Sequence, residues 1–243
     1  MKTLALAAFI QFVISLSTAM AQDRYYNWSE QFESEDPGEF ELESYSNFDT
    51  PSYSSSNHSL VQTFELEYAF SDRVQARISQ GFLKGYPAGE FSSGVLEVEG
   101  LYRLVAPGKF YFDPVVYLSF SRSWTPGSAR TAEAKLILSK DIGPINALVV
   151  GSTEYDLGGE SELKPEMSAG VSYQIVEGLR AGVEAFATGE DEDKTEDADL
   201  RGTGIGPTVS FSTPWFWMTT GASFGLSGAA NNLNFRTIIG IDL

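Results

Sequence analysis

Residues 60–70 read LVQTFELEYAF, and residues 74–82, a short turn further on, read VQARISQGF. In both stretches large apolar side chains alternate with small, polar or charged ones. Successive side chains of a β-strand point to opposite sides, so this period of two is typical of a strand with one apolar face. The two stretches predict a β-hairpin that turns at Ser71-Asp72.

The same alternation continues to the C-terminus and predicts an all-β fold, without a convincing amphipathic helix. We expect about twelve strands, near residues 38–48, 58–70, 73–83, 94–105, 109–121, 130–140, 145–156, 164–175, 179–189, 202–212, 216–227 and 232–243.

The connections between these strands alternate in length. Short turns, such as those at 106–108 and 176–178, alternate with longer polar loops at 49–57, 84–93, 122–129, 157–163, 190–201 and 228–231. This alternation predicts an up-and-down antiparallel meander whose long loops all lie at one end. Transmembrane β-barrels of the bacterial outer membrane have this asymmetry, with short periplasmic turns and longer external loops.

The first residues predict export. Met1–Ala21 begins with Lys2, continues with an apolar stretch and ends in Ala19-Met20-Ala21, a pattern typical of a cleaved signal peptide. We therefore expect a signal peptide at 1–21, a short periplasmic N-terminal segment at 22–37 and an outer-membrane β-barrel at 38–243.

The composition excludes several classes of function. The chain of 243 residues holds 33 Asp and Glu against 16 Lys and Arg, and a net charge of −17 argues against binding to nucleic acid through its phosphates. It has no cysteine, which excludes disulfides, thiolate metal sites and thiol catalysis. No cofactor is implied.

Alternation alone leaves open which way the apolar face points, because a soluble lipocalin-like barrel or a sandwich has the same period. Three observations favour lipid outside: about twelve strands, a last strand that runs to Leu243, and aromatic residues at both ends of the strands, as in interfacial girdles. These aromatic residues are Tyr68, Phe70, Phe110, Phe112, Trp215 and Trp217 near the turns, and Phe82, Phe91, Phe120, Trp124 and Tyr155 near the loops.

The signal peptide, the meander and the apolar last strand resemble bacterial outer-membrane β-barrels. The phrase FELEYAFSDR at residues 64–73 is similar to a hairpin of small outer-membrane transporter barrels, including the family associated with the phenol-degradation pathway. Such barrels usually finish in Phe or Trp, whereas this chain finishes in Leu243. The resemblance implies a location in the outer membrane of a bacterial cell. It also implies contact with outer-membrane lipid and lipopolysaccharide, and insertion by the outer-membrane assembly machinery.

If Phe64 and Leu66 face lipid, then Glu65 and Glu67 face the lumen. The same parity, carried through every strand, places nearly all mid-strand charges on the inner face, where they avoid the ~2–4 kcal/mol cost of charge in the bilayer centre. It pairs Glu67 with Arg77 and Phe70 with Val74 across the first hairpin. The predicted pore-lining residues are Glu65, Glu67, Arg73, Arg77, Glu97, Glu99, Arg103, Asp113, Glu133, Lys135, Glu166, Arg180, Glu184 and Arg236, and the same face holds Glu41, Glu43, Glu154 and Asp242.

Two interpretations of this interior compete. The first is an outer-membrane channel or transporter that passes a small solute through a charged, Glu-rich lumen; small inward residues on later strands, such as Gly170 and Gly182, leave room for it. The second is a structural or surface-binding barrel whose lumen is plugged. Twelve strands lie between the eight that side chains can fill and the sixteen that leave a channel. We expect the channel.

No catalytic or metal-binding residue is expected, and a barrel enzyme acting on lipid is the remaining alternative. His58 is the only histidine, and Leu60 stands where a serine on the same side of the strand would be needed. The acidic loop at 190–199 lacks the glycine and the last glutamate of a calcium loop, although loose binding of divalent cations there stays open. The pairs Glu65/Glu67 and Glu97/Glu99 fit lumen lining rather than glycosidase chemistry.

Overall fold

The computed structural model describes residues 24–32, 36–50, 58–86, 89–106, 108–124, 130–158, 163–189, 200–227 and 233–243. The predicted signal peptide at 1–21 and the acidic loop at 190–199 lie outside the described residues. Within them there is no helix that could span a membrane. The strands are β1 (Phe40–Thr50), β2 (Ser59–Ser71), β3 (Val74–Gly85), β4 (Ser92–Arg103), β5 (Asp113–Ser123), β6 (Arg130–Ile142), β7 (Ile145–Asp156), β8 (Leu163–Val176), β9 (Leu179–Gly189), β10 (Leu200–Thr213), β11 (Phe216–Gly225) and β12 (Leu233–Asp242).

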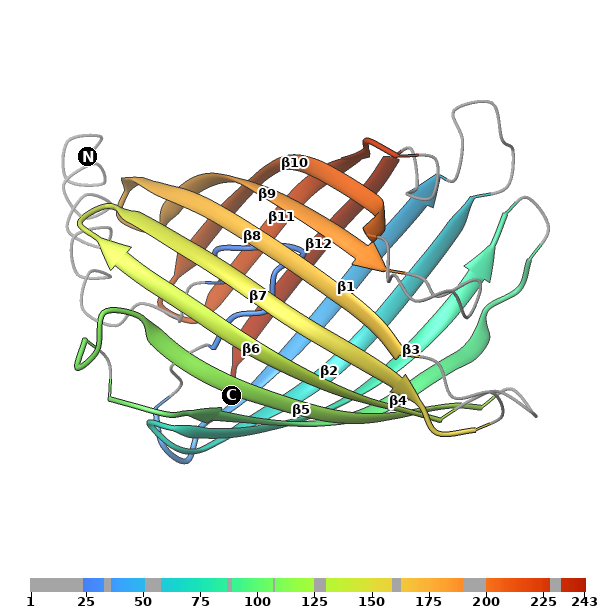
Figure 1. The fold of residues 1–243 in the computed structure, drawn as a ribbon, viewed down its shortest axis with the longest axis horizontal. Coiled ribbons are helices and arrows are strands. Elements are labelled where there is room, and N and C mark those ends of the chain that lie inside the picture. The colour runs from blue at the N-terminus through green and yellow to red at the C-terminus, as the bar shows by residue number, and fades with distance from the viewer. Residues whose placement is uncertain are drawn as a thin grey trace, which may run out of the picture.

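The twelve strands form one closed barrel (Figure 1). Each strand pairs antiparallel with the next along the chain, and β1 pairs with β12, which places Leu42 opposite both Leu66 and Ile241. Closure leaves no unpaired strand edge for lipid to meet. The predicted all-β, twelve-stranded antiparallel barrel is confirmed, with strand bounds within a few residues of those expected.

Two local features differ from the prediction. The connection between β4 and β5 spans residues 104–112, so Phe110 and Phe112 lie in this connection rather than in a strand. In the first hairpin Glu67 lies opposite Arg77 as predicted, but the pairing of Phe70 with Val74 is wrong. A bulge at Phe70 shifts the register there and sets Ser71 opposite Val74.

The outer face of the barrel is apolar and the inner face is largely polar. Phe64, Leu66 and Ile78 are exposed on the outside, whereas Glu65, Glu67 and Arg77 are buried inside. The strand middles therefore present to the exterior the side chains that a lipid environment favours.

Trp217 is an exception among the aromatic residues expected in the outer girdles. It is fully buried, its indole N–H donates a hydrogen bond to Glu41 on β1, and it packs against Ile238 on β12. Its assignment to the outer face is wrong, because the parity of β11 turns residue 217 inward while Phe216 is half-buried on the other face. The barrel interior thus also contains apolar side chains.

Candidate functional site in the barrel lumen

Residues 24–32, which we call the lumen segment, lie inside the barrel (Figure 1, blue loop enclosed by the strands). They belong to the stretch 22–37 that the sequence predicts as a short periplasmic segment. Phe32 lies beside Arg103, the last residue of β4, near the end of the barrel that carries the short turns, which we call the turn end. Asn27 reaches Arg236 on β12, deeper in the lumen.

A single carboxylate holds the middle of the lumen segment. Glu184 on β9 is buried and accepts hydrogen bonds from three successive backbone amides, those of Asn27 (2.6 Å), Trp28 (2.9 Å) and Ser29 (2.8 Å). Hydrogen bonds to an ionised acceptor are stronger than those between neutral groups. These contacts fix the backbone of the segment against the barrel wall.

Ion pairs hold Glu30 of the lumen segment. Its carboxylate lies 2.7 Å from Arg77 Nη1 on β3 and 3.9 Å from Lys135 Nζ on β6. Burial favours a higher pKa of Glu30, but the positive charges of Arg77, Arg24 and Lys135 outweigh this effect and lower the pKa from 4.5 to about 2. Glu30 is therefore ionised in the docked segment at neutral pH.

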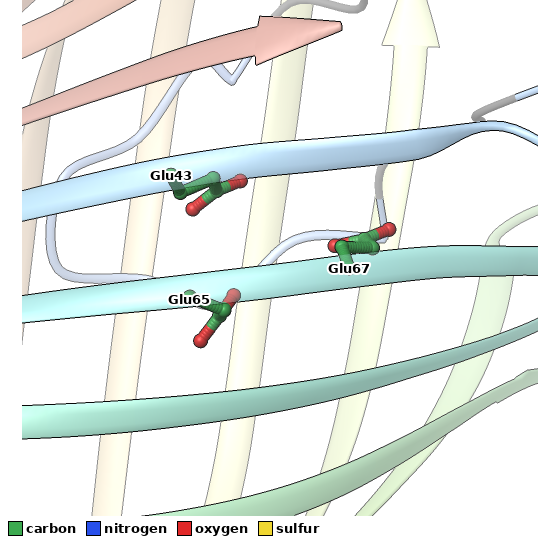
Figure 2. Close-up of side chains that lie close together, drawn as sticks. All are labelled: Glu43, Glu65 and Glu67. Carbon is green, nitrogen blue, oxygen red and sulfur yellow. The ribbon is translucent and has the colours of Figure 1, made fainter. Parts of the chain in front are cut away.

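Arg24 carries the opposite charge into a cluster of carboxylates. Figure 2 shows Glu43 on β1 beside Glu65 and Glu67 on β2, and one oxygen of each carboxylate lies within 4.8 Å of the others. Arg24 Nη1 lies 3.7 Å from Glu43, and Arg77 contacts Glu67 and lies 3.8 Å from Glu65. The spacing of this trio suits a metal ion, but two of the protein's own guanidinium groups already pair with it.

Apolar and aromatic contacts complete the docking of the segment. Tyr26 and Phe32 are buried in a cluster with inward-facing apolar residues of β4 to β7, and Tyr26 Oη donates a hydrogen bond to Asn146 Oδ1 at 2.7 Å. Gly170 on β8 gives the Tyr26 ring its room, since a Cβ at this position would overlap the ring. Arg103 lies over the Phe32 ring, 4.1 Å from its centroid.

The predicted pore-lining residues divide by their relation to the segment. Arg73 and Asp113 lie half-buried at the turn end, and Arg103 there contacts Phe32. Apart from Arg103, those that contact the lumen segment, or pair directly with a residue that does, are Arg77, Lys135, Arg180, Glu184, Arg236, Glu65, Glu67 and Glu133. Glu97 and Glu99 line a cavity on the side of the segment that faces the longer loops, and Glu166 on β8 lines a smaller cavity beside Trp28.

Space remains between the lumen segment and the end of the barrel that carries the longer loops, the loop end. One cavity of about 280 Å³ is lined by Arg24, Trp28, Glu30, Tyr45, Asn47, Val61, Thr63, Glu65, Ser79, Glu97, Glu99, Tyr117, Glu133, Lys135 and Arg236. A second, of about 320 Å³, shares four of these wall residues and extends along β2 to β5 toward the loops. A third, of about 260 Å³, lies along β6 to β9 and shares Glu133 with the first. The lumen is thus hollow above the segment.

The lumen segment supplies candidate site residues that sequence reasoning missed, namely Arg24, Tyr26, Trp28 and Glu30. A signal was present: residues 24–32 read RYYNWSEQF, which is rich in aromatic side chains for a solvated linker. His58 lies directly before the first residue of β2, with its ring beside Phe48 and its Nδ1 3.3 Å from Thr50 Oγ1.

The comparisons with known proteins concern the fold. No family model matches the sequence, and no curated protein matches it. The COG4313 outer membrane channel from Pseudomonas putida F1 has a TM-score of 0.62 with 14% identity, covering 88% of this chain and 99% of that one. The NanC porin has a TM-score of 0.60 with 9% identity, covering 83% and 100%.

A third similar structure is the translocator domain of the autotransporter NalP from Neisseria meningitidis, with a TM-score of 0.51 and 10% identity, covering 85% of this chain and 89% of that one. At these identities the likeness shows the architecture, which channels and a translocator share. Together with the apolar exterior, it shows that this protein has the fold of the β-barrels of the bacterial outer membrane.

Proposed function

We propose that the protein is an outer-membrane channel for a small polar solute, closed at its turn end by the lumen segment. The observation that carries this proposal is a pair of adjoining cavities that have four wall residues in common. Together they extend from the loop end of the barrel to Trp28 and Glu30 of the lumen segment, which occupies the lumen beneath them. The charged side chains predicted to line the pore would set the electrostatic field that the solute meets.

Passage requires the lumen segment to shift, because Glu30 and Tyr26 occupy the interior between β3 and β8. Many of the contacts that hold the lumen segment are polar or ionic. If the segment shifts, water can enter the space around it and replace these hydrogen bonds. A permanently plugged barrel is the second candidate, and the dense contacts around Glu184 favour it.

Planar-bilayer recording from the purified mature protein separates the two candidates. A channel gives discrete current steps in potassium chloride. The absence of current at every voltage and at several pH values would contradict the channel and support the plugged barrel.

A further inference from the structure

One acidic side chain in the 280 Å³ cavity has neither a hydrogen-bond nor an ion-pair partner in the part of the chain that the structure describes. Glu99 on β4 is only 8% exposed, and its side chain lines this cavity. Among the described residues, no hydrogen bond or ion pair reaches its carboxylate. An ionised carboxylate that is buried without a partner is unfavourable, and a cation that enters the cavity from outside the chain would supply the partner.

The cationic side chains nearest to Glu99 are engaged elsewhere. Arg77 contacts Glu67 and lies 2.7 Å from Glu30, and Lys135 lies 3.2 Å from Glu133. Neither forms an ion pair with Glu99. The wall as a whole has five carboxylates and three cationic side chains, so the cavity retains an excess of negative charge.

Aromatic and polar groups line the same cavity as this carboxylate. Tyr117 on β5 donates a hydrogen bond to Glu97, the next inward residue of β4, at 3.4 Å. Trp28 of the lumen segment forms part of the cavity wall, and its buried indole N–H has no hydrogen-bond partner among the residues that the structure describes. Rings in the wall of an acidic cavity suit an organic cation better than a bare ion, because they contact an apolar body and also attract a cationic group, as the Tyr117 ring does with Lys135 Nζ, 4.3 Å from its centroid.

The arrangement of the other lumen carboxylates also favours an organic cation over a metal ion. Within the described ranges, the trio Glu43, Glu65 and Glu67 in Figure 2 is the group whose oxygens converge closely enough for a metal, and Glu99 is not part of it. Arg24 and Arg77 pair with that trio. The carboxylates that come closest to a metal site are therefore paired with guanidinium groups of the protein itself.

We propose that the cavity above the lumen segment binds a small organic cation, with a primary ammonium or guanidinium group paired to Glu99 and its apolar body beside Tyr117 and Trp28. The inference rests on the proposed function, since it names the class of solute that the channel would take. At about 280 Å³ the cavity lies near the lower end of the range for ligand pockets, which limits the solute to a small molecule.

Benzylammonium is a suitable probe, because it joins one ammonium group to one ring. We expect isothermal titration of the detergent-solubilised mature protein with benzylammonium chloride to show one site per chain. Benzyl alcohol and benzoate have the same ring without the positive charge. They should bind at least about tenfold more weakly, because they lack the charge-assisted contact with Glu99. This comparison needs only the wild-type protein.

The variant Glu99→Gln keeps the shape of the side chain and removes its charge, and it should raise the dissociation constant of benzylammonium at least about tenfold. The matched control is Glu154→Gln, which removes a lumen carboxylate that lies outside this cavity and near Lys164. It should leave binding unchanged. An unchanged constant in Glu99→Gln, equal binding of benzoate, or displacement of the probe by calcium at lower concentration would overturn the proposal.

The titration does not depend on current, so the two proposals fail separately. Binding without conductance would contradict the channel but not the site. Conductance without binding would contradict the site but not the channel.

Discussion

Arg77 on β3 lies 2.7 Å from Glu30, which joins a wall of the barrel to the lumen segment that fills it. The same guanidinium contacts Glu67 on β2, a cross-strand pair that belongs to the barrel alone. The wall pair does not involve the lumen segment, whereas the contact with Glu30 does. Arg77 thus contributes both to the barrel and to the docking of the segment.

Closure should depend on pH through Glu30. Its pKa of about 2 in the docked segment lies below its ordinary value of 4.5, so its ionised form favours docking. A group with a lowered pKa adds stability above its ordinary pKa and loses it as the pH falls through the lowered value. We expect docking to weaken between about pH 4.5 and 2, seen in bilayer recordings as more frequent opening.

The variant Glu30→Gln should lack this part of the pH dependence and open more often at neutral pH. Glu39→Gln, an exposed carboxylate before β1, serves as the control. Identical pH profiles for Glu30→Gln and the wild-type protein would show that this ion pair does not hold the segment.

Glu184→Gln should loosen the middle of the lumen segment. The amide has one acceptor oxygen in place of two and turns an N–H₂ group toward three N–H donors, so we expect docking to lose about 1.5–3 kcal/mol. The open probability in bilayers should rise at least about tenfold. Glu154→Gln, which does not touch the segment, should behave like the wild type, and equal gating in the two variants would argue against the role of Glu184.

Gly170→Ala should displace Tyr26, because the added methyl group would overlap its ring. We expect the variant to fold as a barrel, since the ring can leave with the segment, and to conduct more than the wild type. Gly151→Ala on the adjacent strand is the matched control, because a Cβ there meets nothing within 4 Å. If both alanine variants conduct alike, the Tyr26 ring does not occupy this place.

The outer face can be tested with Leu118, an exposed residue in the middle of β5. Leu118→Arg should lower the free energy of unfolding in lipid vesicles by ~2–4 kcal/mol, because it puts a charge at mid-depth in the bilayer. Leu118→Ala separates the loss of the apolar side chain from the added charge. An arginine variant as stable as the alanine variant would mean that this face does not contact lipid.

The sequence predicts the barrel well because its pattern is local. Each strand pairs with its neighbour in the chain, so parity and short turns set the register of pairs such as Glu67 with Arg77. Phe70 departs from this rule because a bulge leaves no trace in the alternation. Trp217 departs because a position near a strand end does not distinguish an outer girdle residue from an inward one.

The lumen segment was beyond the same reasoning, because its contacts are remote in the chain. Tyr26 meets Asn146 across 120 positions, and Asn27 meets Arg236 across 209. The alternation of apolar and polar residues along a strand carries no information about contacts between residues so far apart in the sequence. What the sequence does provide is the inward acidic face, which includes Glu184, bound to the segment, and Glu99, on the wall of the cavity.

Comparison of the intact protein with a variant that lacks residues 24–32 shows whether the lumen segment closes the channel. Both are recorded in planar bilayers under the same salt and voltage, and heat-dependent migration on gels verifies that each barrel is folded. We expect the variant to show larger and more persistent single-channel currents than the intact protein. Equal conductance in the two, or no current from either, would contradict a channel that the lumen segment closes.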